Sequence, residues 1–369
     1  MKIRIPFLDL APMHRELSKS LGFKFSELLQ KGIFSGGEEV DIFESKMSNL
    51  LKSPFAISCA NGSDAIELAL RVLGIGMGDE VLVPALTWVS TAESVVLTGA
   101  KPVFVDVDEN GLIDLDLLQG LDSPRIKAVI PVHLYGKMVK MPILKQLAEL
   151  KRWWVIEDAA QAFGASMDGQ PAGGFGEMGC FSFYPTKNLG ALGEAGMVTT
   201  YRKDLADKLL HLRNHGQAQR DHHEIVGRNS RIDTLQAAFL NVKLDHFKAW
   251  QEKRKDLAKD YLYGLKDVPG IKLPQGILDV SHNAHIFQIQ TENRDRIQKH
   301  LFKFGIGTAI HYPKTVPSTP AFGKLQGYPV AERLADTSLS LPLHPYMRQD
   351  DIAYISQVLT SYLNKVGGI

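Results

Sequence analysis

The chain has few cysteines and no long hydrophobic run. Cys59 and Cys180 are the only two cysteines among 369 residues, and both fall in segments that we predict to be strands. This sparseness argues against a disulfide-stabilised scaffold and fits a reducing compartment. No apolar stretch approaches the length that spans a bilayer, and the first ten residues lack the apolar core of a secretory signal. We therefore expect a cytoplasmic protein with no membrane partner.

The chain also lacks an excess of charge of either sign. Lysine and arginine number 42 against 41 aspartates and glutamates, and no segment reads as a basic recognition helix. A balanced chain has no overall field that would attract nucleic acid. We expect no nucleic-acid partner, although this balance is compatible with a local positive pocket for a phosphorylated ligand.

No metal site is expected. The most histidine-rich segment is 215–224, in which His222 and His223 are adjacent in a polar stretch. Zinc-binding histidines on a helix are typically four residues apart, so that both face the metal. The segment therefore does not have the spacing of a zinc site.

The sequence does contain an alternation of short apolar runs with amphipathic segments over its first two-thirds. Such alternation is typical of βαβ units, in which helices cover both faces of a largely parallel sheet. In sheets of this kind, ligands bind beyond the carboxyl ends of the strands. The predicted strands are 55–59, 80–83, 102–107, 126–133, 153–158, 180–184 and 196–201, and the predicted helices between them include 63–73, 87–98 and 142–151.

The pattern changes after about Arg231. A chain of this length exceeds the size at which one hydrophobic core keeps growing, so two domains are expected. Helical spacing over 232–265 predicts one long helix or two in succession. We predict an α/β fold with a large domain, residues 1–245, whose mostly parallel sheet is flanked by helices, and a smaller C-terminal α+β domain, residues 246–369. The predicted elements of the smaller domain are a strand over 285–290, a helix over 294–304, a proline-rich loop over 312–320 and a helix over 350–363.

Lys187 lies in an unusual setting for a lysine. It follows the aromatic strand-like segment 180–184 and precedes a glycine-rich turn that begins at Gly190. Burial would lower the pKa of its ammonium group and make a nucleophilic amine available. Such an amine can form a Schiff base with a carbonyl, including the aldehyde of pyridoxal phosphate. A lysine at a strand end can instead extend its head to water, and Lys187 alone does not distinguish the two.

Asp158 ends an apolar run that begins at Trp153. A carboxylate at the end of a buried parallel strand is costly unless it is paired. The pyridine nitrogen of pyridoxal phosphate is a suitable partner, because that chemistry needs the nitrogen to stay protonated. Gln161 follows three residues later and could reach the ring hydroxyl. Asp158 could equally cap the next helix, but its combination with Lys187 favours the cofactor.

The segment after the predicted strand 55–59 suits a phosphate. Gly62 permits close backbone approach, and the free N–H groups at a helix start, together with the hydroxyl of Ser63, can hold an anion. Ser182 could add a second hydroxyl, and simple helix capping is the alternative. Trp88 follows another predicted strand and would suit stacking on a planar ring, although a core position is the more frequent explanation for a tryptophan.

Together these segments resemble the sugar aminotransferase family named DegT/DnrJ/EryC1/StrS, within the aspartate aminotransferase fold (fold type I). The resemblance covers nearly the whole chain in the family's order, and it implies that residues 1–245 bind pyridoxal 5'-phosphate. The matching segments are ANGSDAIELAL, GDEVLVPALTWVSTAESV, KPVFVDVD, KAVIPVHLYG, VIEDAAQAFGA, GCFSFYPTKNLGALGEAG, RNHGQ, NSRIDTLQAAFLNVKL, GIGTAIHYP and SLSLPLHP.

The resemblance implies a role for each matching residue. Lys187 and Asp158 are the implied catalytic residues: Lys187 binds the cofactor aldehyde and then moves protons, and Asp158 pairs with the pyridine nitrogen. The other implied cofactor contacts are Gln161 at the ring hydroxyl, Trp88 over the ring face, Gly62, Ser63 and Ser182 at the phosphate, and Asn229, which would reach the same phosphate from the partner subunit of a homodimer. The implied substrate contacts are Tyr184, Arg231, His311 and Tyr312.

The activity implied by the resemblance is the conversion of a nucleotide-linked keto-hexose to an amino sugar, with glutamate as the amino donor. Lys187 favours amination over the deoxygenation of a branch that has histidine at this position. The segments ISCANGSDA and HGQ…HHEIVGRNSR are more similar to members that aminate C3 than to members that aminate C4. Two alternatives are an aminotransferase for a free cyclic ketone such as an inosose, and a catalytically inactive regulatory or binding homologue.

Overall fold

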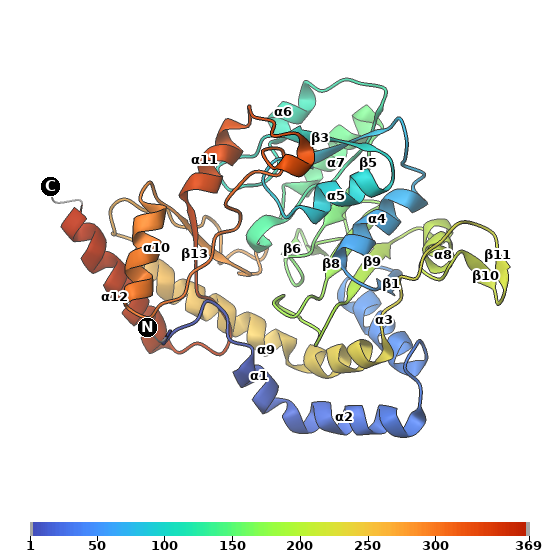
Figure 1. The fold of residues 1–369 in the computed structure, drawn as a ribbon, viewed down its shortest axis with the longest axis horizontal. Coiled ribbons are helices and arrows are strands. Elements are labelled where there is room, and N and C mark those ends of the chain that lie inside the picture. Colours follow the sequence, from blue (N-terminus) through green and yellow to red (C-terminus); the bar gives the residue numbers. More distant parts are fainter. Residues whose placement is uncertain (1–2, 367–369) are drawn as a thin grey trace.

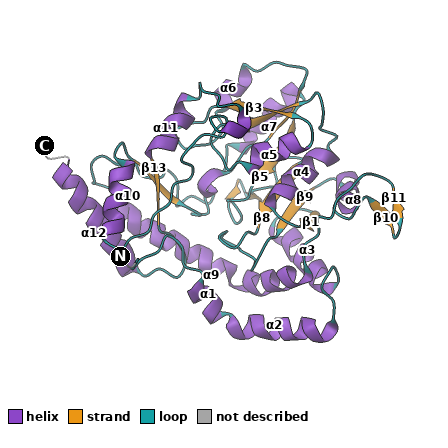
Figure 2. Cartoon of the chain, in the orientation of Figure 1, coloured by secondary structure: helices purple, strands orange, loops and turns teal. Residues whose placement is uncertain are grey.

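The computed structural model describes residues 3–366. Its centre is a seven-stranded sheet with the strand order β1-β9-β8-β5-β4-β2-β3 (Figures 1 and 2). Neighbouring strands are parallel except at β9, which is antiparallel to both β1 and β8. The prediction of a mostly parallel sheet is therefore confirmed. The strands are β1 (Phe55–Cys59), β2 (Glu80–Pro84), β3 (Lys101–Val105), β4 (Ile126–Val129), β5 (Trp154–Asp158), β8 (Met178–Ser182) and β9 (Gly196–Thr200).

Both faces of this sheet are buried. Val81 and Val83 belong to one hydrophobic core, and Leu82 between them belongs to another, because successive side chains of a strand point to opposite faces. Strands covered on both sides can be apolar throughout, which explains the short apolar runs in the sequence. The helical elements of this part are α1 (Ala11–Glu16), α2 (Ser18–Lys31), α3 (Glu38–Leu50), α4 (Gly62–Val72), α5 (Ser90–Leu97), α6 (Leu115–Gln119), η1 (Leu134–Gly136), α7 (Met141–Lys151) and α8 (Lys203–Leu212).

The long helix α9 (Thr234–Leu265) connects the sheet to the C-terminal part of the chain (Figure 1). It is one helix of 32 residues, which settles the choice between one helix and two. The elements beyond it pack around a core of their own that includes Phe287 and Leu359. The predicted domain boundary at 245/246 lies inside α9 and stays a prediction. The C-terminal elements are β12 (Phe287–Gln290), α10 (Arg294–Lys303), η2 (Pro320–Phe322), α11 (Pro329–Thr337), β13 (Ser338–Leu341) and α12 (Gln349–Val366), with β12 antiparallel to β13.

Two predicted elements extend three or more residues beyond the observed ones at one end. The predicted strand 126–133 ends at Val129, because Pro131 has no N–H to continue the hydrogen-bond ladder. The predicted helix 87–98 begins only at Ser90. Two small ribbons have no counterpart among the predicted elements: β6 (Ser166–Met167) with β7 (Gln170–Pro171), and β10 (Gln217–Gln219) with β11 (His222–His223).

Within residues 3–366, no helix has both the length and the hydrophobicity needed to cross a bilayer. In the same part of the chain, no three His, Cys, Asp or Glu side chains lie together in a way that could hold a metal ion.

Candidate active site

A cavity of about 790 Å³ opens at the carboxyl ends of β5 and β8, beside the start of α4. This is the edge of a parallel sheet at which ligands bind. The structure therefore brings together residues that the sequence analysis found in separate segments. The predicted site residues that line the cavity are Gly62, Ser63, Trp88, Asp158, Gln161, Ser182, Tyr184, Lys187, His311 and Tyr312.

Lys187 lies in the turn that follows β8. The turn is closed by hydrogen bonds from the Lys187 N–H to the Tyr184 carbonyl, at 2.8 Å, and from the Ala191 N–H to the Phe183 carbonyl, at 2.8 Å. Burial lowers the pKa of Lys187 to about 8, and the nearby Asp158 carboxylate acts in the opposite direction. A large fraction of this amine is therefore neutral and nucleophilic just above neutral pH.

Asp158 is the last residue of β5 and is buried. Its Oδ2 accepts a hydrogen bond from the Thr91 hydroxyl at 2.9 Å, and its Oδ1 accepts one from the Ala160 N–H at 3.2 Å. Burial raises the pKa of Asp158 above its usual value, while these hydrogen bonds and the charge of Lys187 limit the rise. A buried carboxylate of this kind is poised to pair with a cationic group in the cavity.

The start of α4 forms the other end of the cavity. The Asn61 side chain caps the helix by accepting a hydrogen bond from the Asp64 N–H at 2.8 Å. A Cβ atom at Gly62 would lie 2.7 Å from the Ser182 Cβ, so only glycine lets the helix approach β8 this closely. Ser63 donates its hydroxyl to Ser90 at 2.8 Å. A helix N-terminus with hydroxyls beside it is suited to a phosphate.

An aromatic wall closes the cavity on the side of the C-terminal part. The rings of Trp88 and Tyr312 lie 5.6 Å apart, and Trp88 is 57% exposed. Gln161 joins the two parts of the chain: its Oε1 accepts from the Tyr135 N–H at 2.6 Å, and its Nε2 donates to the Tyr312 hydroxyl at 3.1 Å. Burial and the charge of Lys187 lower the pKa of His311 to about 4, so this side chain is neutral.

Two predicted site residues, Asn229 and Arg231, do not line this cavity. Both are exposed, Asn229 pairs with Asn214 through a backbone bridge, and the Arg231 guanidinium donates to the Asn214 side chain at 2.7 Å. The ion pair of Arg228 with Asp64, at 3.0 Å, fixes this segment to α4. The roles predicted for Asn229 and Arg231 stay predictions.

The sequence analysis missed Thr91, which holds Asp158, and His285, which lines the cavity. The Asn188 amide nitrogen donates to Gln251 and Asn283, so its oxygen accepts from His285 Nδ1 at 2.8 Å. The His285 proton is therefore on Nδ1, and Nε2 is a hydrogen-bond acceptor. Burial and the charge of Lys187 hold the pKa of His285 well below its usual value. No sequence pattern distinguished this histidine from a core residue.

Comparisons with known proteins agree with the fold. The profile of the DegT/DnrJ/EryC1/StrS aminotransferase family matches residues 18–360. A relative from Acidithiobacillus ferrooxidans, a UDP-N-acetyl-3-dehydro-alpha-D-glucosamine 3-aminotransferase, is 41% identical over 98% of both chains. A dTDP-3-amino-3,4,6-trideoxy-alpha-D-glucose transaminase from Streptomyces venezuelae is 38% identical over 98% of this chain and 97% of its own.

Solved structures give the same result. The crystal structure of DesV from S. venezuelae, in complex with a ketimine intermediate, has a TM-score of 0.95 at 39% identity and covers 98% of both chains. NtdA from Bacillus subtilis, with bound cofactor PMP, has a TM-score of 0.91 at 30% identity over 98% of this chain and 86% of its own. The predicted family, fold and aminotransferase class are confirmed. The chain belongs to the DegT/DnrJ/EryC1/StrS aminotransferase family.

Proposed function

We propose that the protein is a pyridoxal 5'-phosphate-dependent aminotransferase that aminates a nucleotide-linked keto-hexose at C3, with L-glutamate as the amino donor. The observation that carries this proposal is the placement of Lys187, with a pKa lowered to about 8, in one cavity with the buried Asp158 carboxylate and the start of α4. These three groups come from three separate segments and supply an amine, an acid and an anion site.

The residues of the cavity fit the cofactor. Asp158 is a buried carboxylate that needs a cationic partner, and Gly62 lets the start of α4 approach β8 closely enough for the helix N–H groups and the hydroxyls of Ser63 and Ser182 to border one cavity, where they would hold a phosphate. Bound there, the cofactor would supply an electron sink for the carbanion that forms when a proton leaves the substrate.

The remaining chemistry belongs to side chains of this chain. We infer that Lys187 Nζ would hold the cofactor aldehyde and, once free, would move a proton to and from the reacting carbon. Its lowered pKa favours the neutral amine that both tasks require. Asp158 would pair with the protonated pyridine nitrogen of the cofactor, and Trp88 beside Tyr312 would supply an aromatic surface for its ring. The amino group passes through the enzyme in two half-reactions, so ping-pong kinetics are expected.

The substrate class follows from the relatives and from the cavity. Two relatives at 38–41% identity carry names that place the amine at C3 of a UDP- or dTDP-linked sugar. Tyr184, His311 and Tyr312 line the cavity with hydroxyl and imidazole groups that suit a polyol. These observations support C3 over C4, the preference already indicated by the sequence.

The proposal includes a homodimer with shared active sites. Asn229 is exposed and lies outside the cavity of its own chain, which agrees with a role at the cofactor phosphate of a partner subunit. Exposed apolar side chains on and after α2, including Phe23, Leu29 and Phe34, supply a surface that a partner would cover. Light scattering should give twice the chain mass, and Asn229→Ala should weaken cofactor binding without changing that mass.

The test of the proposal is an assay of the purified, cofactor-loaded protein with L-glutamate and a panel of 3-keto and 4-keto hexoses linked to UDP, dTDP or GDP, with inosose as the non-nucleotide member. Formation of 2-oxoglutarate and an amino sugar is measured by mass spectrometry. We expect turnover of a 3-keto nucleotide sugar to exceed that of its 4-keto isomer. Turnover of inosose alone would refute the proposal.

A further inference from the structure

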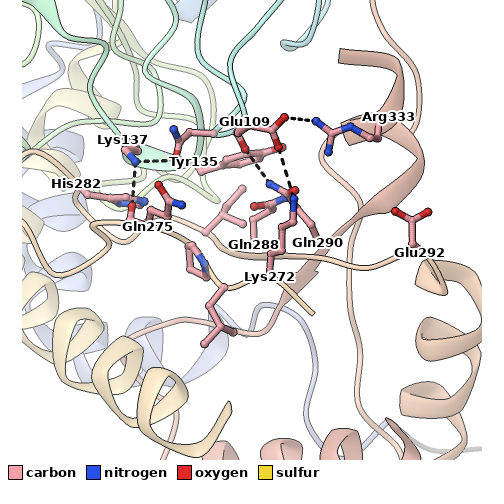
Figure 3. A pocket seen from close by; sticks show the side chains of 14 residues that line it. Glu109, Tyr135, Lys137, Lys272, Gln275, His282, Gln288, Gln290, Glu292 and Arg333 are labelled. Carbon is pink, nitrogen blue, oxygen red and sulfur yellow. Dashed lines mark hydrogen bonds and ion pairs between the residues drawn. The ribbon is translucent and has the colours of Figure 1, made fainter. Parts of the chain in front are cut away.

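A second cavity, of about 540 Å³, lies between the sheet and the C-terminal part (Figure 3), and Ile286 lines both this cavity and the first. The sheet side of its wall comes from the segments around Glu109 and Tyr135. The C-terminal side comes from the segment that begins at Lys272 and from β12. Its size is within the range of small-molecule sites, and the function proposed above does not use it.

One corner of this cavity donates hydrogen bonds and positive charge. The Lys137 ammonium contacts only neutral oxygens among residues 3–366, the Asn110 Oδ1 at 2.8 Å and the Gln275 carbonyl at 3.1 Å. Beside it in Figure 3, His282 is 3% exposed and lines the same corner.

The tautomer of His282 follows from its one hydrogen bond. Its Nδ1 accepts from the Ala284 N–H at 3.0 Å, and burial with the charges of two lysines lowers its pKa to about 3. The imidazole is therefore neutral, with its proton on Nε2. That N–H has no protein acceptor in the described part of the chain, so a ligand in the cavity that His282 lines can accept a hydrogen bond from it.

The opposite wall accepts hydrogen bonds. The Gln290 Nε2 donates to the Glu109 carbonyl at 2.9 Å, which fixes the orientation of the amide, and its buried Oε1 has no partner within residues 3–366. Gln288 is 6% exposed, and its Nε2 donates to the Ser338 hydroxyl at 2.7 Å, which leaves its Oε1 as a second acceptor. Figure 3 shows both glutamines across the cavity from Lys137.

The charges of the wall favour one negative charge on a ligand. Lys137, Lys272 and Arg333 face Glu109 and Glu292, and the Glu109 carboxylate is already paired with Arg333 and, at 3.7 Å, with Lys272. Lys137 is therefore the cation without a carboxylate contact. The two amide oxygens opposite are neutral and suit hydroxyl donors.

We propose that this cavity is a second ligand site for a small hydroxylated monocarboxylate of the sugar-acid type. Its carboxylate contacts the Lys137 ammonium and the His282 Nε2–H, its hydroxyls donate to Gln288 and Gln290, and its carbon skeleton lies against the Tyr135 ring. This inference does not depend on the proposed function, since it concerns groups outside the first cavity.

The site is connected to the first cavity through Tyr135. The backbone N–H of this residue donates to Gln161, and its hydroxyl donates to the His311 carbonyl at 2.5 Å. Both Gln161 and His311 line the first cavity, and Ile286 lines both. A ligand that packs on Tyr135 therefore stabilises the packing of the C-terminal part against the sheet.

The test uses the cofactor-loaded protein with sodium gluconate as the probe, sorbitol as the uncharged control of the same carbon number, and sodium chloride to equalise ionic strength. Calorimetry and thermal unfolding measure binding, so the result does not depend on catalytic activity. We expect saturable binding of gluconate and a rise in Tm, with little effect of sorbitol. Binding that dTDP displaces would place gluconate in the first cavity and overturn the proposal.

The variants sharpen this test. Lys137→Met should weaken gluconate binding about tenfold to hundredfold, as expected for loss of a charge-assisted hydrogen bond. Lys145→Met is the matched control, because Lys145 is exposed and does not line the cavity. Gln290→Leu removes an acceptor from the opposite wall and should also weaken binding. Equal affinity of the wild type and a folded Lys137→Met protein, or equal effects of gluconate and sorbitol, would contradict the proposal.

Discussion

Two lysines of this protein have the same lowered pKa and different surroundings. Burial lowers the pKa of both Lys187 and Lys243 to about 8. Lys243, in α9, is 1% exposed; its ammonium donates to the Gly190 carbonyl at 2.6 Å and contacts His14 Nε2 at 3.0 Å. Lys187 lines the first cavity, and among residues 3–366 its Nζ has no hydrogen-bond partner. A lowered lysine pKa thus reports burial, and access to a cavity is what makes the amine available for chemistry.

Two adjacent carboxylates repeat the contrast. Glu157 and Asp158 end β5 and point to opposite faces of the sheet. Glu157 is fully buried and accepts hydrogen bonds from the N–H groups of Gly173, Phe175 and Gly176, with His133 Nε2 at 2.9 Å. Asp158 has fewer partners and borders the cavity. A carboxylate whose oxygens are fully hydrogen-bonded to backbone N–H groups stabilises the fold. A carboxylate that lines a cavity is a candidate for catalysis.

The largest effect is expected from replacing the two lysines. Lys187→Met should lower the turnover of the nucleotide-sugar substrate by about 10²–10⁴-fold, because it removes the group that moves the proton. Lys243→Met should fold, bind the cofactor and keep most of its turnover, since Lys243 has no access to the cavity. Steady-state kinetics on both variants measure the difference. Equal losses of turnover in Lys187→Met and Lys243→Met would contradict the distinction between the two lysines.

The two carboxylates should separate activity from stability. Asp158→Asn should unfold near the wild-type temperature but lose most of its turnover. Glu157→Gln should lose about 3 kcal/mol of unfolding free energy, because three backbone donors lose a charged acceptor, while the folded fraction keeps its specific activity. Urea unfolding and activity per folded molecule are the measurements. A stable, inactive Glu157→Gln protein would assign the chemistry to the wrong acid.

The pH dependence of cofactor capture tests the electrostatics of the cavity. Only the neutral amine attacks an aldehyde, so the rate at which the cofactor-free protein captures pyridoxal phosphate should rise with pH through about 8, the pKa of Lys187. The Asp158 carboxylate raises that pKa, and Asp158→Asn should therefore move the midpoint to lower pH. Stopped-flow absorbance follows the reaction. Lys243→Met is the control and should leave the midpoint unchanged, whereas an upward shift in Asp158→Asn would reverse the inferred sign.

A smaller effect is expected at Thr91. The Thr91 hydroxyl lowers the pKa of Asp158, so Thr91→Val should raise that pKa. Turnover, which needs the Asp158 carboxylate, should then begin to fall at a higher pH on the acidic side of its pH profile. The loss at neutral pH should be about tenfold or less, as for one hydrogen bond to a charged group. Thr87→Val is the matched control: Thr87 contacts the Thr91 hydroxyl at 3.1 Å and does not contact Asp158. An identical profile shift in both variants would contradict this role for Thr91.

The sequence predicted the parts of the site that follow from local patterns. Asp158 ends an apolar strand, Lys187 lies in the turn that follows another, and Gly62 opens a helix, so the rule for the carboxyl edge of a parallel sheet was enough to group them. Thr91 and His285 reach the cavity only through tertiary packing, and no periodicity marks them. The strand predicted over 126–133 was too long because hydrophobicity continues past Val129, whereas Pro131 interrupts the regular hydrogen-bond pattern of the strand.

The second cavity could not be predicted from the sequence either, because all of its polar contacts depend on tertiary packing. Lys137, His282 and Gln290 come from segments far apart in the sequence and meet where the sheet packs against the C-terminal part. In the sequence, none of these three residues is distinguished from an ordinary polar residue. The prediction for Asn229 differs from these, because its role at the phosphate requires a second subunit.

The central claim is that Lys187, and not Lys243, carries the cofactor. It is tested most directly by loading the protein with pyridoxal phosphate, reducing it with borohydride, and mapping the modified peptide by mass spectrometry. We predict one reduced cofactor adduct per chain, on the peptide that contains Lys187, and none on the peptide that contains Lys243. An adduct on Lys243, an adduct spread over surface lysines, or an unmodified Lys187 would contradict the claim.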